Sequence, residues 1–246
     1  MKTVLIFCIL LLFSPGGFAK VDLPRGLNAQ ERGRVLEILG PSSGLRVLGD
    51  PYPLGGYSGV EIGVSYETIS TTDFSGLGSK PTLQGETSYL QLGFAKGLYY
   101  NFDLFVNVAP MGQSEEVSSF GGGFRWGFFE AEYMPISLSL QVGANSTSFQ
   151  DQVNVTTQSI DLIAGFAVED ITMYVGAGTI KAAGSFLGNK ANPSRGMTDT
   201  GETIEESLST SRFLAGLVIK YSKAFFSLEV ARSYDPTYGA KIGVRF

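Results

Sequence analysis

The stretch that decides the fold is TYGAKIGVRF, residues 237–246. Side chains alternate between the two faces of an extended strand, and here every second one is apolar: Tyr238, Ala240, Ile242, Val244 and Phe246. The other face carries glycines, Lys241 and Arg245. A strand that turns its apolar face to lipid and its polar face to a wet lumen explains this pattern, and also explains why the stretch ends on an aromatic residue.

This strand resembles the C-terminal signature of Gram-negative outer-membrane β-barrel proteins. The resemblance implies that Tyr238, Ile242, Val244 and Phe246 form the signal that the barrel-assembly machinery recognises. It also implies that the protein resides in the cell outer membrane, with outer-membrane lipid around it. An ordinary half-buried strand of a soluble sheet is the alternative for these ten residues, so the rest of the chain has to decide.

Composition narrows the possible classes of protein. The chain has 246 residues, 32 glycines and only 17% charged residues, which suits a single large domain with little charge on its surface. Its formal net charge of −5 and the lack of a basic stripe exclude a nucleic-acid partner.

Residues 1–19 have the pattern of a secretory signal peptide. Lys2 supplies the positive start, residues 4–13 the apolar run, and Gly17-Phe18-Ala19 the cleavage site. The run is too short for a membrane-spanning helix, which needs about 20 residues. Cys8 lies inside the leader, so the mature chain is expected to contain no thiol.

Residues 20–56 predict a separate N-terminal segment with a short helix over about 29–39. Asn28 and Glu31 have the spacing of a capping box, and Gly40-Pro41 indicates the end of the helix. The sequence leaves two positions open for this segment. It either caps the barrel on the periplasmic side or enters the lumen as a plug.

Residues 57–246 predict an all-β fold, an antiparallel up-and-down transmembrane barrel of about ten strands. Period-2 alternation places apolar residues on one face at 60–66, 90–94, 104–108, 120–128, 136–142, 160–166, 173–177, 213–219, 226–230 and 238–246. Short turns are expected near 97–101, 130–135, 168–171 and 222–224, and longer polar links near 70–85, 110–118, 146–156, 181–208 and 232–236. A soluble β-sandwich would also have many short strands, but it would not explain this alternation of link lengths.

The lumen-facing positions hold charged residues that we expect to pair across strands. Folding the chain about Ser114 places Asp103 opposite Arg125, and folding it about Asp235 places Glu229 opposite Lys241. Asp161 and Lys220 also face the lumen, and barrel closure brings Glu61 close to Lys241 and Arg245. These charges either fill and stiffen a narrow lumen or line a selectivity pathway.

The sequence contains no histidine, and its one cysteine lies in the leader. Known outer-membrane hydrolases and acyl transferases depend, as families, on a catalytic histidine, so we expect no enzymatic activity, and we also expect no cofactor and no tight metal site. Two functions remain open. One is a non-enzymatic barrel that supports the envelope or displays residues 181–208 to an external partner, and the other is a narrow passive channel. Neither the external partner nor a solute can be identified from these residues.

Overall fold

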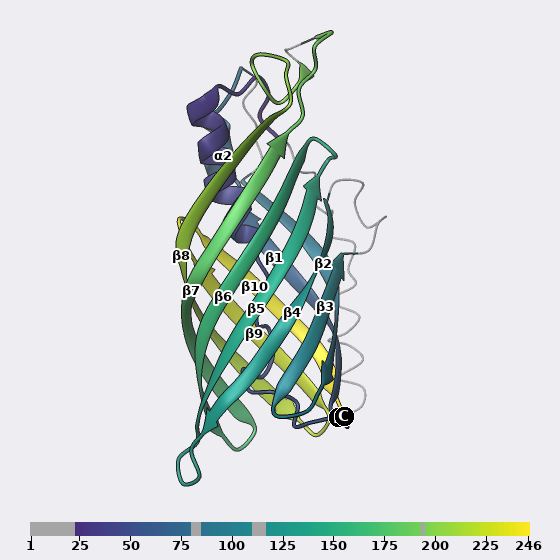
Figure 1. Cartoon of the computed structure of the whole chain (residues 1–246), viewed down its shortest axis with the longest axis vertical. Helices are drawn as coiled ribbons and strands as arrows, with labels where there is room; N and C mark the ends of the chain where they lie inside the picture. Colours follow the sequence, from purple (N-terminus) through teal and green to yellow (C-terminus); the bar gives the residue numbers. More distant parts are fainter. Residues whose placement is uncertain (1–22, 80–84, 110–116, 193–194) are drawn as a thin grey trace.

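The computed structural model describes residues 23–79, 85–109, 117–192 and 195–246, and they form a closed antiparallel β-barrel (Figure 1). Each strand pairs with the next along the chain, and β10 closes the barrel on β1. The strands are β1 (Val60–Ser70), β2 (Glu86–Gly97), β3 (Phe102–Ala109), β4 (Val117–Glu130), β5 (Ile136–Phe149), β6 (Val153–Val168), β7 (Ile171–Phe186), β8 (Ile204–Tyr221), β9 (Ala224–Arg232) and β10 (Pro236–Arg245). The predicted fold class is confirmed.

The outer face of the barrel is apolar all the way round. Large side chains at alternating positions remain exposed on every strand, such as Ile62, Phe124, Leu162 and Val175. Soluble monomers rarely expose contiguous apolar patches larger than a few hundred Å². A continuous apolar band on a closed barrel is the arrangement of a transmembrane barrel in lipid.

The connections fall at two ends of the barrel, a turn end and a loop end, but the predicted alternation of short and long links holds only in part, because the loop-end links 150–152 and 233–235 are as tight as the turns. The turn end holds Phe246 and the short links 98–101, 131–135, 169–170 and 222–223. The loop end holds the described parts of the links between these strands, residues 71–79 and 85, 150–152, 187–192 and 195–203, and 233–235, while 110–116 of the predicted link near 110–118 lies outside the described residues.

Two of the predicted loops are shorter than expected. The link predicted at 146–156 is a tight turn of residues 150–152, and the link predicted at 181–208 covers only 187–203. The expected bounds were wrong because the strands β5 to β8 continue past the apolar band with polar residues on their outer face. The buried inner residues Val153, Val155 and Phe186 keep the alternation of a strand.

The helix α2 (Ala29–Ser42) starts at the predicted capping box. The Asn28 side chain accepts from the Glu31 amide at 3.0 Å, and the Glu31 carboxylate accepts from the Asn28 amide at 2.9 Å. The helix runs three residues beyond the predicted end and contains Pro41 in its last turn. A 3₁₀ helix, η1 (Thr72–Gly76), lies in the first loop. Among the described residues, no helix has the length and apolar character needed to cross a membrane.

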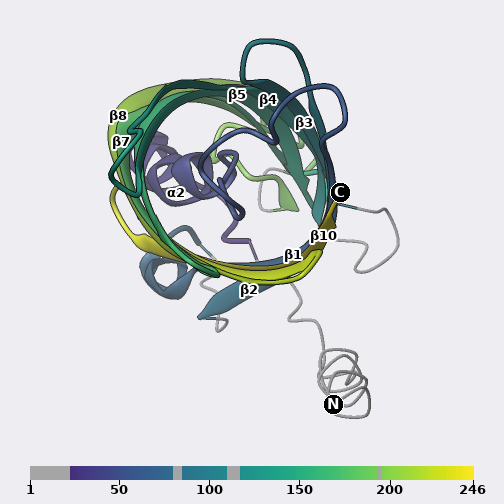
Figure 2. The ribbon, with the colours of Figure 1, turned by 90° about the horizontal axis from the view of Figure 1, so that it is seen from below.

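The described part of the N-terminal segment, residues 23–56, lies inside the barrel rather than beneath it (Figure 2). Figure 2 shows α2 and the chain that follows it within the ring of strands. The helix occupies the loop end, where it contacts β6, β7, β8 and β1. From there, residues 43–56 run through the lumen to the start of β1 at the turn end. This is the plug arrangement, and the alternative of a periplasmic cap is wrong. The predicted signal peptide, residues 1–19, lies outside the described residues.

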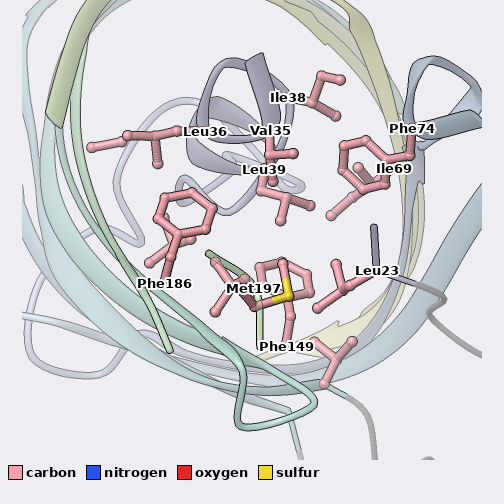
Figure 3. Close-up of a cluster of buried hydrophobic side chains, with 14 of the residues drawn as sticks. Leu23, Val35, Leu36, Ile38, Leu39, Ile69, Phe74, Phe149, Phe186 and Met197 are labelled. Carbon is pink, nitrogen blue, oxygen red and sulfur yellow. The ribbon is translucent and has the colours of Figure 1, made fainter. Parts of the chain in front are cut away.

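An apolar core closes the loop end (Figure 3). Leu36 and Leu39 of α2 pack with Phe74 of η1, Phe149 of β5 and Phe186 of β7, and all of these side chains are at most 1% exposed. This is the largest hydrophobic cluster of the described residues, and two smaller clusters, one with Val47 and one with Leu45, lie along the plug that follows α2.

Candidate functional site

The candidate site is the lumen, where residues 43–56 meet the inner faces of the strands. Six cationic and six anionic side chains form ion pairs there, so their formal charges balance: Arg46, Arg125, Arg212, Lys220, Lys241 and Arg245 with Asp50, Glu61, Glu67, Asp103, Asp161 and Glu229. Unpaired charge at such depth would be costly, which explains the balance.

Arg46 of the plug lies at the centre of the site. Its Nε donates to Glu67 of β1 at 3.0 Å, and its Nη1 lies 3.9 Å from Glu229 of β9. The Tyr89 hydroxyl donates to Glu67 at 3.2 Å, and the Tyr174 hydroxyl donates to Glu229 at 2.8 Å. One guanidinium thus joins two carboxylates from different strands, and each carboxylate also accepts a hydrogen bond from a tyrosine hydroxyl.

Glu229 also fixes the backbone of the plug. Its Oε2 accepts from the amides of Val47 and Leu48 at 3.0 and 3.2 Å. Charge-assisted hydrogen bonds of this kind are about twice as strong as neutral ones. The plug is therefore held through its main chain as well as through Arg46.

Asp103 and Arg125 are opposite each other on β3 and β4, as the sequence predicts. Arg125 Nη2 donates to Asp103 at 2.9 Å, and both side chains are at most 5% exposed. Asp103 also accepts from the Leu54 amide at 3.0 Å, and Arg125 donates to the Asp50 carbonyl. The predicted wall pair therefore also binds the plug.

The predicted pairing of Glu229 with Lys241 is wrong. Glu229 is opposite Gly239, and Lys241 is opposite Ser227. The β9–β10 link pairs Pro236 with Arg232, so its centre is residue 234 instead of 235, and an error of one residue at the turn moves the register by two.

Lys241 instead pairs with the neighbouring strand β1. Its Nζ donates to Glu61 at 2.7 Å, and Arg245 donates to the other oxygen of Glu61 at 3.0 Å. Barrel closure thus gives Glu61 the two cationic partners that the sequence suggested.

Asp50 holds the plug at the turn end. Its carboxylate lies 3.2 Å from Arg245 and also pairs with Lys220. Burial by itself would raise the pKa of Asp50, but the charges of Arg245 and Lys220 outweigh this and lower that pKa.

Six residues of the site were missed in the sequence: Arg46, Asp50, Glu67, Tyr89, Tyr174 and Arg212. Arg212 Nε donates to Asp161 at 3.0 Å, and its Nη1 donates to the Leu45 carbonyl at 2.8 Å. Glu67, Tyr174 and Arg212 lie at positions of lumen-facing parity, so strand alternation could have identified them. Arg46 lies in an irregular segment where no periodicity exists to place it.

A small pocket lies between the plug and the wall. A cavity of about 20 Å³ is lined by Arg46, Glu61, Glu67, Arg125 and Lys241, among others. That volume has room for about one water molecule.

The predicted assembly residues lie on the outside of β10. Tyr238, Ile242, Val244 and Phe246 are all exposed. The Phe246 backbone pairs with Val60 through N···O distances of 2.9 and 3.0 Å, which joins the end of the chain to the start of β1. These side chains are therefore available both to lipid and to a protein that reads the strand.

No known protein family and no curated protein matches this sequence. Solved structures of similar fold include the N-terminal β-barrel domain of Pseudomonas aeruginosa OprF, at 16% identity, covering 78% of this chain and 99% of that one, with a TM-score of 0.38. An outer membrane channel from Pseudomonas putida F1 is 13% identical over 80% of this chain and 98% of that one, with a TM-score of 0.48. Ail of Yersinia pestis, in complex with the heparin analogue sucrose octasulfate, is 13% identical over 76% and 98%, with a TM-score of 0.35.

At these identities the likeness concerns the fold alone. The class follows from the chain's own features, since a closed barrel with an apolar exterior and a polar interior is a transmembrane β-barrel of the outer-membrane type.

Proposed function

We propose that the protein is a non-enzymatic integral barrel of the cell outer membrane, closed by its own N-terminal segment, with a structural or surface-interaction role. The short turns and Phe246 face the periplasm in this proposal, and the loop end faces outside. The observation that carries it is the contact of the N-terminal segment with the wall at the loop end, in the middle and at the turn end of the lumen.

Three levels of contact support a permanently closed barrel. The apolar core around α2 closes the loop end, Arg46 with Glu67 and Glu229 holds the middle, and Asp50 holds the turn end. Breaking a buried ion pair by removing one partner costs about 3–5 kcal/mol. Withdrawal of the plug would break several pairs at once, so spontaneous opening is expected to be very rare.

The chemistry of the lumen supports a role without catalysis. The carboxylates of Asp103 and Asp161 are each held by an arginine, and the sequence has no histidine to act as a base. The barrel-assembly machinery is the partner that the C-terminal strand implies. An external partner would meet residues 187–203, which bond to the N-terminal segment through Leu27 and Met197 at 2.8 Å.

Conductance in planar bilayers tests the closed lumen against the alternative of a narrow channel. The unmodified protein should be silent, whereas a variant lacking residues 29–52 should conduct, because the wall would then surround an unfilled lumen. Lys190→Gln, which changes an exposed ion pair in the external loop, serves as a matched control and should be silent. Stable openings of the unmodified protein would favour the channel.

A further inference from the structure

The loop end of the barrel is asymmetric, because four strands rise well beyond the apolar band. β5, β6, β7 and β8 have 14, 16, 16 and 18 residues, whereas β3 and β9 have 8 and 9 (Figure 1). The inner face of this extension packs on α2 and the apolar core, with Val155, Ala182 and Phe186 buried. Its outer face is exposed.

The strand register arranges the residues of this outer face in rows, which show where the apolar band ends. One row is entirely apolar: Leu140, Leu162, Ala177 and Phe213. The next row is mixed. A row further toward the loop end has lost its large apolar side chains: Ser146, Thr156, Ala183 and Ser207. The band therefore ends within one or two rows.

Above the mixed row lies a surface that we call the hydroxyl wall, made of the outward-facing residues in 144–148, 154–158, 181–185 and 205–209. It contains two charged residues, Lys181 and Glu205, and is otherwise serine, threonine, asparagine, glutamine and alanine. None of the ion pairs among the described residues involves Lys181. The wall is thus a rigid sheet face of small hydrogen-bonding groups.

The height of the wall indicates what lies against it. From Lys181 to Ser185 the strand rises about 13 Å, and a tilt of about 40° turns this into about 10 Å along the membrane normal. A phospholipid headgroup layer is only about 5–8 Å thick. The wall is continuous with the lipid-facing band and extends past such a layer, as an oligosaccharide headgroup would.

The low charge of the hydroxyl wall favours sugars over phosphates as its ligands. Surfaces that recognise anionic headgroups use clusters of about 4–8 lysines and arginines. Lys181 stands alone here, whereas hydroxyl and amide groups can exchange hydrogen bonds with uncharged sugar hydroxyls.

We propose that the hydroxyl wall binds the neutral sugars of the oligosaccharide carried by outer-leaflet glycolipids. This inference rests on the proposed outer-membrane location, and it does not depend on whether the lumen is closed. The wall then anchors the barrel on one side, through the sugars of the lipids whose acyl chains contact the band below.

A single nitroxide label attached to an introduced cysteine tests the proposal. The mature chain is expected to have no cysteine of its own, so only the introduced one would be labelled. A nitroxide is placed on the wall by Thr156→Cys, and on the other side of the barrel, above Leu90 of β2, by Ser88→Cys. Both proteins are reconstituted in vesicles containing a glycolipid with a complete core oligosaccharide or the same lipid A without a core. Collision of the nitroxide with a water-soluble nickel chelate is then measured.

The complete core should lower the accessibility at residue 156 severalfold and leave residue 88 nearly unchanged. Equal accessibility of residue 156 in both lipids would overturn the proposal, and so would equal protection of residues 156 and 88, which indicates mere crowding. Adding Lys181→Gln should preserve the protection. If that change abolishes it, the contact is with phosphate and the neutral-sugar assignment is wrong.

The unmodified protein provides a second measurement that needs no label. After purification in detergent, mass spectrometry should find more core-bearing glycolipid than core-less lipid A retained on the folded barrel. Equal retention would overturn the proposal. Conductance of the same sample separates this result from the closed-lumen proposal, because a conducting barrel could still retain the glycolipid.

Discussion

Arg46→Met removes the one cation that joins the plug to two strands of the wall. The substitution leaves Glu67 without its 3.0 Å partner and Glu229 without the guanidinium at 3.9 Å, with both carboxylates at most 4% exposed. Glu229 keeps the Tyr174 hydroxyl and two backbone amides, so most of the cost falls on Glu67. We expect a loss of about 3–5 kcal/mol in the free energy of unfolding, typical of a buried pair that loses one partner.

A double change should recover much of this loss. In Arg46→Met with Glu67→Gln, the carboxylate that loses its hydrogen-bonded cation is removed as well, so the two substitutions should be strongly non-additive. The control is the exposed pair of Lys190 and Glu202, 3.7 Å apart with side chains 81% and 67% exposed. There, Lys190→Met should cost no more than about 1 kcal/mol.

Urea titration of the protein in lipid vesicles measures these differences. The chain has a single tryptophan, Trp126, which lies on the outer face stacked on Phe102, so its fluorescence reports whether the barrel is folded. Equal slopes of the transitions are required before their midpoints are converted to free energies. A loss for Arg46→Met as small as that of the control would refute the reasoning, because the lumen would then be as well solvated as the surface.

Three further predictions concern the membrane, assembly and pH. The protein should resist urea extraction from membranes and migrate differently on gels before and after heating, whereas recovery in a soluble periplasmic fraction would contradict the barrel assignment. Deleting Phe246 should reduce the amount of folded barrel without reducing export, and unchanged folded levels would remove the assembly role of the last strand. Because the pKa of Asp50 is lowered in the folded protein, its ion pairs stabilise the fold fully above the ordinary carboxyl pKa of about 3.9, and this contribution is lost as the pH falls through the lowered value. The difference in urea midpoint between the unmodified protein and Asp50→Asn should therefore shrink from pH 6 to pH 3, and a constant difference would show that titration of Asp50 contributes nothing.

Local alternation along the chain was enough to predict the barrel. Apolar residues at every second position of ten segments, with alternating short and long links, indicate strands that face lipid on one side, and these strands are present. The same parity placed Glu61, Asp103 and Glu229 in the lumen. The limits of β5 to β8 were harder to predict, because a strand that rises out of the membrane exchanges its apolar outer residues for serine and threonine and then resembles a loop.

The sequence by itself therefore determined which elements form and which way their side chains face, because strand parity is a property of neighbouring residues. Only the tertiary structure decided which charges meet. A change of one residue at the centre of the β9–β10 link moved Lys241 from Glu229 to Glu61. The tertiary structure also decided the ion pairs of the plug. Arg46 and Asp50 belong to an irregular segment, and their partners on β1, β8, β9 and β10 are far away in the sequence. Such contacts depend on the closed ring of strands, and no local pattern encodes them.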